Sequence, residues 1–391
     1  MPSSCDRRRR VLIVTGEASG DLLGANLVTA ARALDAAVEF YAVGGDKMAA
    51  AGCEIVVPSS ELAVMGLVEV VRSLPRIWRV YRRLTGLLRG ADRPDLVILI
   101  DSPDFNLRLA RVARNCAVPV LYYVSPQVWA WRRGRVRTIA ARVDKLAALF
   151  PFEPQYYAGL PIDVRYVGHP LLDEVARCRP AHKCRRQLQL EDSYPRIALF
   201  PGSRSNEIKY CFDTIVASAA RLSARYPAAV FVVAVAAHVD EELLRQKLAA
   251  AGVRARLVRE DIYTVAAACD AAICVSGTIT LQVALVQTPM VIIYKAAALT
   301  YAIGKRLVQV CHFGLPNIVA GRRVVRELLQ DEASAAAVSA EVGRILDDDA
   351  YRAELVAGLA EVKELMGSPG CSRRVAQMAL ELMAADTEEN S

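Results

Sequence analysis

The chain has 391 residues, of which 54% are hydrophobic and 23% are charged, and its formal net charge is +7. The length favours two α/β domains over a single core. The charge is too modest to indicate nucleic-acid binding, but it suits an anionic ligand or membrane surface. No apolar run reaches the ~18 residues of a membrane span, and Val11–Thr15 is too short for the core of a signal peptide. The 10 cysteines form no C-x-x-C pair, which favours reduced thiols in a cytosolic protein over a metal site.

The first predicted unit is a strand over Val11–Thr15 followed by a helix over Leu22–Leu34. The loop between them reads G-E-A-S-G-D and lies at the carboxyl end of the strand, where open α/β sheets bind ligands. It lacks the G-x-G-x-x-G spacing of a dinucleotide fingerprint. Two interpretations stay open, a tight turn with a capping serine or a ligand loop. The candidate binding residues of the second interpretation are Glu17, Ser19, Gly20 and Asp21.

Strands are next predicted at Val38–Val43 and Glu54–Val57, and then comes an amphipathic segment, Met65–Arg89. Pro75 predicts two short helices there rather than one. A basic helix that carries Trp and Tyr is typical of a membrane interface, although an ordinary helix with solvated arginines has the same spacing. The candidate membrane-facing residues are Leu67, Arg72, Leu74, Arg76, Trp78, Arg79 and Tyr81.

An almost unbroken apolar run, Asp95–Ile100, predicts a buried parallel strand. The motif D-S-P-D-F-N follows and places two carboxylates and Asn106 at the carboxyl end of this strand. Asp104 could simply cap the next helix. Asp101 stands directly at the strand end, so it is the candidate general base.

A strand over Val118–Val124 leads into the aromatic and basic segment S-P-Q-V-W-A-W-R, which contains Trp129. This segment is either a packed loop or a surface that recognises a phosphorylated or acylated ligand. A further strand is predicted at Lys145–Phe150. His169 precedes a proline in a turn, where a structural role is at least as probable as catalysis.

The polar and basic segment 173–195 is predicted to be a linker between two Rossmann-like domains. The first domain covers 1–172 and the second 196–366, followed by a terminal helix and tail at 367–391. In the second domain, strands alternate with helices, which predicts a doubly wound parallel sheet. The strands are expected at Ile197–Phe200, Ala229–Val235, Ala255–Val258, Ala271–Val275 and Met290–Tyr294.

Two loops of the second domain are typical of an anion site. P-G-S-R follows the strand that ends at Phe200, and S-G-T follows the strand that ends at Val275. Backbone N–H groups and helix N-termini suit a phosphate, and an arginine can bind one through two parallel hydrogen bonds. We expect both loops to bind one diphosphate through Gly202, Ser203, Arg204, Ser276, Gly277 and Thr278.

A donor held by its diphosphate, together with a carboxylate that activates a hydroxyl, describes transferase chemistry. Direct displacement at an anomeric carbon would invert its configuration. The second domain contributes no carboxylate cluster that could hold a metal.

A series of motifs, in order along nearly the whole chain, closely resembles lipid-A-disaccharide synthases, which are inverting glycosyltransferases of the GT-B fold. The motifs are G-E-A-S-G-D, D-S-P-D-F-N, S-P-Q-V-W-A-W-R, F-P-F-E, V-G-H-P-L, P-G-S-R, S-G-T-x-T-L and L-P-N. The resemblance implies two Rossmann-like α/β domains that face each other across a cleft. It also implies transfer of 2,3-diacylglucosamine from UDP to the 6-hydroxyl of 2,3-diacylglucosamine 1-phosphate. The products would be the β-1,6 lipid A disaccharide 1-phosphate and UDP, without a metal or cofactor.

The resemblance also implies residue roles. Asp101 matches the essential aspartate of the family, Arg204 matches its P-G-S-R arginine, and Asn317 matches a polar residue near the donor site. Gln282 stands where the family usually has a glutamate that binds the ribose. An amide oxygen can accept the same hydrogen bond, but without charge assistance.

The acyl chains of these substrates imply a peripheral protein on the inner face of the inner membrane of a Gram-negative cell. The helix after Gly370 could pack on the first domain or on a partner, which leaves a homodimer open. Two alternatives to the main hypothesis remain. One is another GT-B enzyme that uses a UDP-sugar, such as a sugar-nucleotide epimerase or a soluble-acceptor transferase. The other is a non-catalytic protein that binds an anionic lipid.

Overall fold

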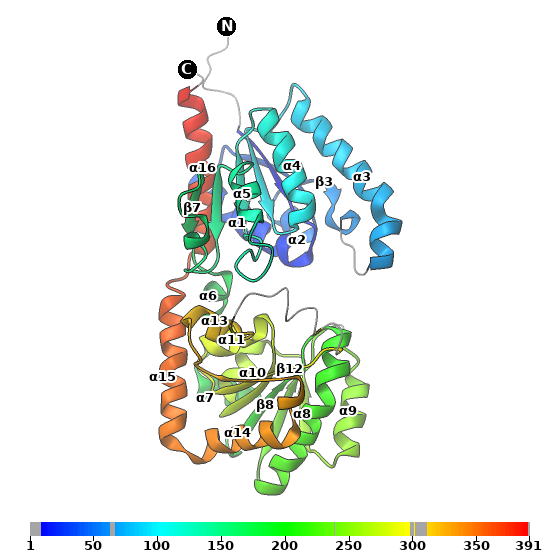
Figure 1. The fold of residues 1–391 in the computed structure, drawn as a ribbon, viewed down its shortest axis with the longest axis vertical. Coiled ribbons are helices and arrows are strands. Elements are labelled where there is room, and N and C mark those ends of the chain that lie inside the picture. Colours follow the sequence, from blue (N-terminus) through cyan, green and yellow to red (C-terminus); the bar gives the residue numbers. More distant parts are fainter. Residues whose placement is uncertain (1–8, 63–66, 238, 298–300, 302–310, 390–391) are drawn as a thin grey trace. The chain divides into compact units, whose positions relative to one another are not determined.

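The computed structural model describes residues 9–62, 67–237, 239–297, 301 and 311–389, with the backbone alone at 18, 67–72 and 385–389. The chain forms two compact units, residues 1–170 with 369–391 and residues 171–368. Each unit is built on one parallel sheet with helices on its faces (Figure 1).

The first unit has a seven-stranded sheet of order β3-β2-β1-β4-β5-β6-β7. All five residues of β4 are buried, as expected for a parallel strand covered on both faces. Its strands are β1 (Arg10–Val14), β2 (Glu39–Gly44), β3 (Glu54–Pro58), β4 (Leu96–Ile100), β5 (Val120–Tyr123), β6 (Lys145–Ala148) and β7 (Asp163–Tyr166). Its helices are α1 (Ala18–Leu34), α2 (Asp46–Ala50), α3 (Leu67–Arg89), α4 (Pro103–Asn115), α5 (Arg135–Ala140) and α16 (Cys371–Glu389).

The second unit has a six-stranded sheet of order β10-β9-β8-β11-β12-β13. Its strands are β8 (Arg196–Phe200), β9 (Val230–Ala234), β10 (Ala255–Val258), β11 (Ala271–Val275), β12 (Met290–Tyr294) and β13 (Arg326–Leu329). Its helices are α6 (Pro170–Val175), which starts at the boundary, α7 (Ala181–Gln187), α8 (Ser205–Arg225), α9 (Glu241–Ala250), α10 (Ile262–Ala268), α11 (Thr278–Leu285), α13 (Leu315–Ala320), α14 (Ala335–Asp347) and α15 (Asp349–Leu365).

Three expectations about the elements need correction. The segment 173–195 contains α7, which packs against α10, so it belongs to the second unit rather than forming a free linker. Helix α3 runs unbroken through Pro75, because the proline ring is exposed and Val80, Leu84 and Leu88 anchor the following turns in the core. Strands β7 and β13 were not predicted. Both are four-residue edge strands with charged residues, which carry little apolar signal.

Helix α16 packs back on the first unit, along α1. Among the described residues, no helix has the length and apolarity that crossing a membrane requires.

Candidate functional site

Both sheets reverse their strand order at one point, between β1 and β4 in the first unit and between β8 and β11 in the second. The loops that follow such neighbouring strands flank a crevice at the carboxyl edge of the sheet, where open α/β sheets bind ligands. These four loops carry the motifs G-E-A-S-G-D, D-S-P-D-F-N, P-G-S-R and S-G-T. The topology therefore brings the predicted motifs together in two pairs, one pair in each unit.

In the first unit, the two loops are in direct contact. A Cβ atom added to Gly16 would lie only 2.9 Å from the Oγ atom of Ser102. Asp101 and Ser102 have φ angles of 51° and 43°, so two consecutive non-glycine residues adopt the left-handed conformation. Such strain costs roughly 1–3 kcal/mol per residue and is concentrated at functional sites. It marks the end of β4 as a candidate site independently of any motif.

Two buried side chains hold this strained turn. The Nδ2 atom of Asn106 donates to the carbonyl oxygens of Ile100 (3.1 Å) and Asp101 (2.7 Å). The hydroxyl of Tyr122 also donates to the carbonyl of Asp101, at 2.6 Å. Asn106 is fully buried, so it positions the turn, and its predicted role as a direct substrate ligand is not supported by its contacts.

The side chain of Asp101 is half-buried, and burial raises its pKa above the usual carboxyl range, while a hydrogen bond from the Ser102 backbone lowers it. A carboxylate with a raised pKa is a stronger base near neutral pH, which favours proton abstraction.

Asp21 has a structural role that the sequence did not reveal. Its carboxylate is buried and accepts hydrogen bonds from the backbone N–H groups of Gly45 (2.7 Å), Lys47 (3.1 Å) and Met48 (3.3 Å). These groups form the N-terminus of α2, so Asp21 caps that helix from α1. Contrary to expectation, its oxygens are engaged within the fold.

The other residues of this loop are also explained by α1, which begins at Ala18. Ser19 therefore lies in the first helical turn instead of capping it, and Glu17 is the exposed N-cap residue without a side-chain cap bond. A Cβ atom on Gly20 would lie 1.8 Å from Thr15 Oγ1, so the glycine permits close packing of helix on strand. Glu17 remains the exposed carboxylate of the loop.

Asp104 and Trp129 contact other protein groups. Helix α4 begins at Pro103, so Asp104 is not its N-cap, and its exposed carboxylate pairs with Arg135 and, at 3.9 Å, with Arg132. Trp129 is only 3% exposed and donates through Nε1 to the Oε1 atom of Glu153 at 3.2 Å. It is a core residue of its loop, which corrects the expectation that it binds substrate.

Glu153, in F-P-F-E, is a buried carboxylate whose role the motif did not reveal. Its other oxygen accepts from the backbone N–H groups of Leu149 (2.8 Å) and Phe150 (3.0 Å), so the side chain ties together the loops after β5 and β6. Burial raises the pKa of Glu153 to about 7. Burial also lowers the pKa of His169, which packs against Phe150, to about 4, so this histidine is neutral and fits the structural alternative.

In the second unit, a cavity of about 540 Å³ brings both anion loops together. It lies at the carboxyl ends of β8, β9, β10 and β11, and the residues that we predicted there line it jointly. They are Gly202, Ser203, Arg204, Ser276, Gly277, Thr278 and Gln282.

One of its carboxylates occupies the first anion loop. Glu207 accepts hydrogen bonds from the N–H groups of Ser203 (2.9 Å) and Arg204 (3.1 Å), and it lies 3.3 Å from the Arg204 guanidinium. Gly202 has a φ of +93°, and a Cβ there would lie 2.3 Å from the Glu207 carboxylate. The backbone N–H groups of Ser203 and Arg204, which we expected to bind a phosphate, therefore donate to Glu207 instead. The donors for an anion are the exposed Arg204 side chain and the first-turn N–H groups of α8, which have no intrahelical partners.

The second loop is held by the segment that precedes α13 and by β12. The hydroxyl of Ser276 donates to the carbonyl of Phe313 (3.0 Å), and its N–H donates to Ile293 (2.9 Å). Thr278 is exposed at the start of α11, which gives this loop a helix N-terminus of its own.

Asn317 does not line the cavity as expected. It is fully buried, and its amide donates to Val325 (2.8 Å) and Glu327 (2.6 Å) while accepting from the N–H groups of Val324 (2.7 Å) and Val325 (2.9 Å). It fixes the connection from α13 to β13. The cavity also contains residues that we missed, Glu174, Glu207, Arg259, Glu260, Asp261 and Tyr263. The loop after β10 could have been found, because it stands at the carboxyl end of a predicted parallel strand.

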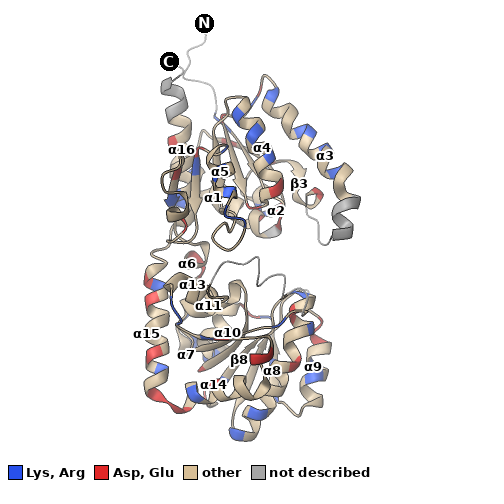
Figure 2. Ribbon diagram, viewed as in Figure 1, with Lys and Arg blue, Asp and Glu red and all other residues tan. Residues whose placement is uncertain are grey.

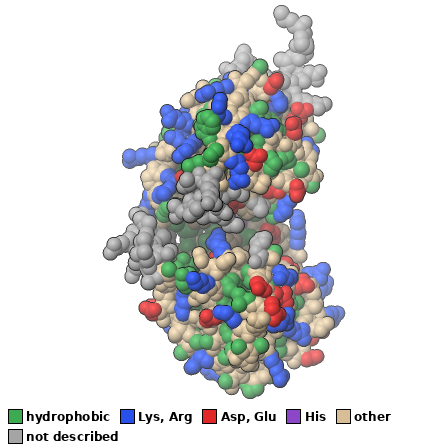
Figure 3. All heavy atoms as spheres, turned by 90° about the vertical axis from the view of Figure 1, so that its right-hand side faces the viewer, with side chains coloured by type: hydrophobic (Ala, Val, Ile, Leu, Met, Phe, Trp, Pro, Cys, Tyr) green, Lys and Arg blue, Asp and Glu red, His purple; other side chains and the backbone are tan. Residues whose placement is uncertain are grey.

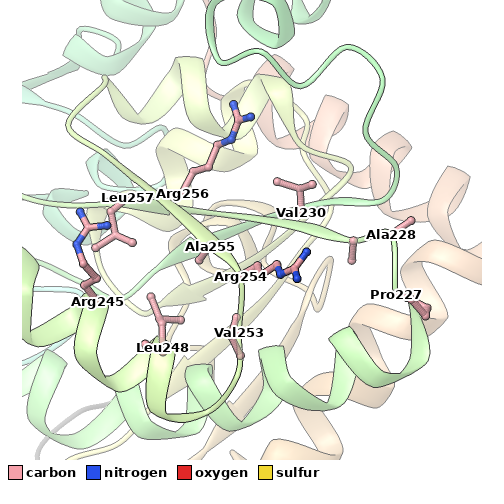
Figure 4. Close-up of a pocket in the computed structure, with 12 residues that line it drawn as sticks. Pro227, Ala228, Val230, Arg245, Leu248, Val253, Arg254, Ala255, Arg256 and Leu257 are labelled. Atoms are coloured by element: carbon pink, nitrogen blue, oxygen red, sulfur yellow. The ribbon is translucent and has the colours of Figure 1, made fainter.

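A second cavity, of about 530 Å³, lies at the amino ends of β9 and β10 (Figure 4). Arg245, Arg254 and Arg256 line it, but their guanidinium groups point in different directions. Arg245 is paired with Glu241 at 2.7 Å, and Arg256 donates to the carbonyl of Leu188. We do not assign an anion site to this cavity.

Helix α3 presents an exposed apolar and basic face. Leu74 and Trp78 are 54% and 59% exposed, and the guanidinium of Arg82 lies 4.7 Å from the Trp78 ring. Arginines lie along the length of this helix (Figure 2). On this side of the first unit, hydrophobic side chains lie between basic ones (Figure 3).

Some of the predicted membrane-facing residues are exposed, and others pack against the protein. Arg79 is exposed, whereas Arg76 is half-buried and donates to Ser73 Oγ at 3.4 Å. Tyr81 packs edge-on against Phe105, with ring centroids 6.0 Å apart, so it belongs to the core face, which corrects that expectation. The side chains of Leu67 and Arg72 lie outside the part of the chain that the structure describes.

Solved structures share the fold. MurG from Acinetobacter baumannii superposes with a TM-score of 0.60 at 13% identity, over 95% of this chain and 99% of that chain. A UDP-GlcNAc 2-epimerase from Neisseria meningitidis, bound to UDP-GlcNAc, superposes with a TM-score of 0.57 at 10% identity, over 96% and 100% of the two chains. At these identities the likeness establishes the fold alone, and the predicted GT-B fold is confirmed.

Sequence relatives are much closer. A protein from Syntrophotalea carbinolica named lipid-A-disaccharide synthase is 54% identical over 374 residues, which cover 96% of this chain and 95% of that protein. A protein of the same name from Geobacter sulfurreducens is 49% identical over 96% of this chain and 97% of its own length. The family model of lipid-A-disaccharide synthetase matches residues 11–380. The chain therefore belongs to the lipid-A-disaccharide synthetase family.

Proposed function

We propose that this chain transfers 2,3-diacylglucosamine from UDP to the 6-hydroxyl of 2,3-diacylglucosamine 1-phosphate. The products are the β-1,6-linked lipid A disaccharide 1-phosphate and UDP. One observation carries the proposal beyond family membership: the two units have equivalent switch points, one with a half-buried carboxylate, Asp101, and the other with an exposed arginine and two helix N-termini. A base and an anion site are the two groups that such a displacement needs.

In the proposed reaction, the 6-hydroxyl oxygen of the acceptor forms a bond to the anomeric carbon of the donor. The bond from that carbon to the β-phosphate oxygen breaks, and its electron pair leaves with UDP. Asp101 takes the hydroxyl proton as the new bond forms, for which it must come within ~3 Å of the acceptor oxygen. Attack opposite the leaving group inverts the anomeric carbon.

The second unit stabilises the leaving group. Negative charge grows on the β-phosphate as the bond breaks, and Arg204 and the first turns of α8 and α11 supply positive ends for it. Each such donor contributes a few kcal/mol at most in a dry site. The uridine is held in the same cavity.

We further propose that the protein binds the inner face of the inner membrane peripherally, through α3. Leu74 and Trp78 would enter the interface while the neighbouring arginines contact anionic headgroups. This arrangement would give the active site access to substrates whose acyl chains remain in the bilayer.

The test is incubation of the purified protein with UDP-diacylglucosamine and diacylglucosamine 1-phosphate, with and without EDTA, followed by mass spectrometry. We expect a disaccharide 1-phosphate and free UDP in both samples. Absence of the disaccharide would refute the proposal, and loss of activity with EDTA would refute metal independence. An epimerised UDP-sugar would instead identify the alternative enzyme class.

A further inference from the structure

The nucleotide cavity contains four described carboxylates, on Glu174, Glu207, Glu260 and Asp261. Rossmann-like sites recognise the ribose hydroxyls of a nucleotide with a carboxylate, because a diol can donate two hydrogen bonds to it. A carboxylate whose oxygens already hold other groups cannot accept hydrogen bonds from a diol in the same geometry.

Two of the four carboxylates, Glu207 and Asp261, already have both oxygens engaged, and Glu260 is held by a residue that does not line the cavity. Glu207 holds the P-G-S-R turn, as described above. Asp261 caps α10, where it accepts from the N–H (2.8 Å) and the hydroxyl (2.6 Å) of Thr264. Glu260 accepts from the side-chain amide of Gln187 at 2.8 Å.

Glu174 differs from these three, because one of its oxygens is held by a buried residue of the cavity wall, Tyr263, and the other is left for a ligand. It is exposed on α6, and its Oε2 atom accepts a hydrogen bond of 2.8 Å from the hydroxyl of Tyr263. Its Oε1 atom has no partner within the described residues. Tyr263 is only 7% exposed, and burial raises its pKa, so it remains a protonated donor that fixes the carboxylate.

Gln282 lines the same cavity, and its side chain lies beside the same phenol. The carboxylate of Glu174 and the amide of Gln282 therefore lie next to the same tyrosine. All three residues line the cavity that the two anion loops also line. Gln282 cannot provide a charged acceptor, whereas Glu174 can.

We infer that Glu174 is the residue that recognises the ribose hydroxyls of the donor nucleotide, with Tyr263 as its positioning residue. The inference rests on the proposed function, because it assigns a part of the UDP site. Recognition of the ribose would then depend on Glu174 of α6 and not only on Gln282 of α11.

The test is calorimetric titration with UDP and with 2′,3′-dideoxy-UDP, which lacks the diol. We expect Glu174→Gln to weaken UDP binding about tenfold, the loss of one charge-assisted hydrogen bond, and to leave dideoxy-UDP binding unchanged. Tyr263→Phe should weaken UDP by a smaller factor with the same ligand dependence. Adding Gln282→Glu to Glu174→Gln should restore UDP affinity, because it returns a carboxylate to the neighbouring position.

Glu191→Gln is the matched control, a change at an exposed carboxylate of the second unit that does not line the cavity and should alter neither affinity. The inference is overturned if Glu174→Gln binds UDP like the wild type, or if it weakens UDP and dideoxy-UDP equally, since the residue would then act on the fold. Failure of the proposed function is a separate outcome: the wild-type protein would bind no UDP or form no disaccharide.

Discussion

Asp101 unites a strained backbone, partial burial and a position at the end of β4. We predict that Asp101→Asn lowers kcat by roughly 10²–10⁴, the usual contribution of a general base. Binding of UDP should be unchanged, because the nucleotide cavity is formed by the second unit alone. Stopped assays with saturating donor and UDP calorimetry measure the two effects. Unchanged turnover would show that another group, such as Glu17, is the base.

Asp101→Asn should also be more stable than the wild-type protein at neutral pH. Because burial raises the pKa of Asp101, the folded protein holds this proton more tightly than the unfolded chain does. The stability that protonation confers is therefore present below the unfolded pKa and is lost as pH rises through the folded pKa. Thermal melts should show a higher Tm for Asp101→Asn at neutral pH, and no difference at acidic pH where the wild-type carboxyl is protonated in both states.

Glu207 raises a different question, because its carboxylate occupies the turn that was expected to hold a phosphate. We predict that Glu207→Ala destabilises the protein by about 1 kcal/mol, the cost of a lost helix cap, and raises the KM for the donor because the Gly202–Arg204 turn loosens. Thermal melts and donor titrations check both effects. A lower KM would mean that the carboxylate competes with the diphosphate instead of holding the turn.

At the scale of elements, Asp21 joins two helices. Asp21→Asn should lower the free energy of unfolding by about 1 kcal/mol, since the cap of α2 loses its charge at a helix N-terminus. Donor and acceptor KM values should not change. Asp46→Asn is the control, because Asp46 is exposed in the first turn of the same helix. A KM effect of Asp21→Asn without destabilisation would return this residue to the ligand site.

Helix α3 is the element that we propose contacts the membrane. Replacing Leu74 and Trp78 with serine should abolish flotation with vesicles that contain anionic phospholipid, while turnover of detergent-dispersed substrates stays near the wild-type rate. Leu243→Ser is the matched control, a 42% exposed leucine on α9 of the second unit. Equal vesicle binding by the double variant and the wild type would assign the exposed face of α3 to another partner.

At the scale of the whole molecule, the first unit is completed by the last helix of the chain. Helix α16 buries Val375, Met378, Ala379 and Met383 and binds Lys145 and Arg165 through Glu381. Deletion of residues 371–391 should lower the melting temperature of the first unit by more than about ten degrees, because each large buried side chain contributes about 1.5–3 kcal/mol. UDP binding should stay intact. Calorimetry that resolves the two unfolding transitions checks this. Glu381→Gln is the control, with an expected cost of about 1 kcal/mol, because the Glu381 carboxylate is partly exposed. Loss of UDP binding would contradict it.

The strand–helix alternation and the loops that follow β1, β4, β8 and β11 were predictable, because apolar runs and the turns that end them are local properties of the chain. The roles of Asp21, Trp129 and Asn317 were not. Each has partners that lie on another element, and their side chains are turned into the fold although they stand in motifs that resemble a ligand site.

By itself, the sequence determined the fold class, the family and the order of the polar loops, because hydrophobic periodicity and motif order can be read along the chain without knowledge of tertiary contacts. Only the tertiary structure decided which polar side chains remain free to meet a ligand. For Asp21, which caps α2, and for Glu174, which stays available beside Tyr263, that decision depends on hydrogen-bond partners far apart in the chain. For Glu207 it depends on how the turn just before it folds. A buried polar group must find a partner wherever the fold supplies one, and the sequence does not show where that is.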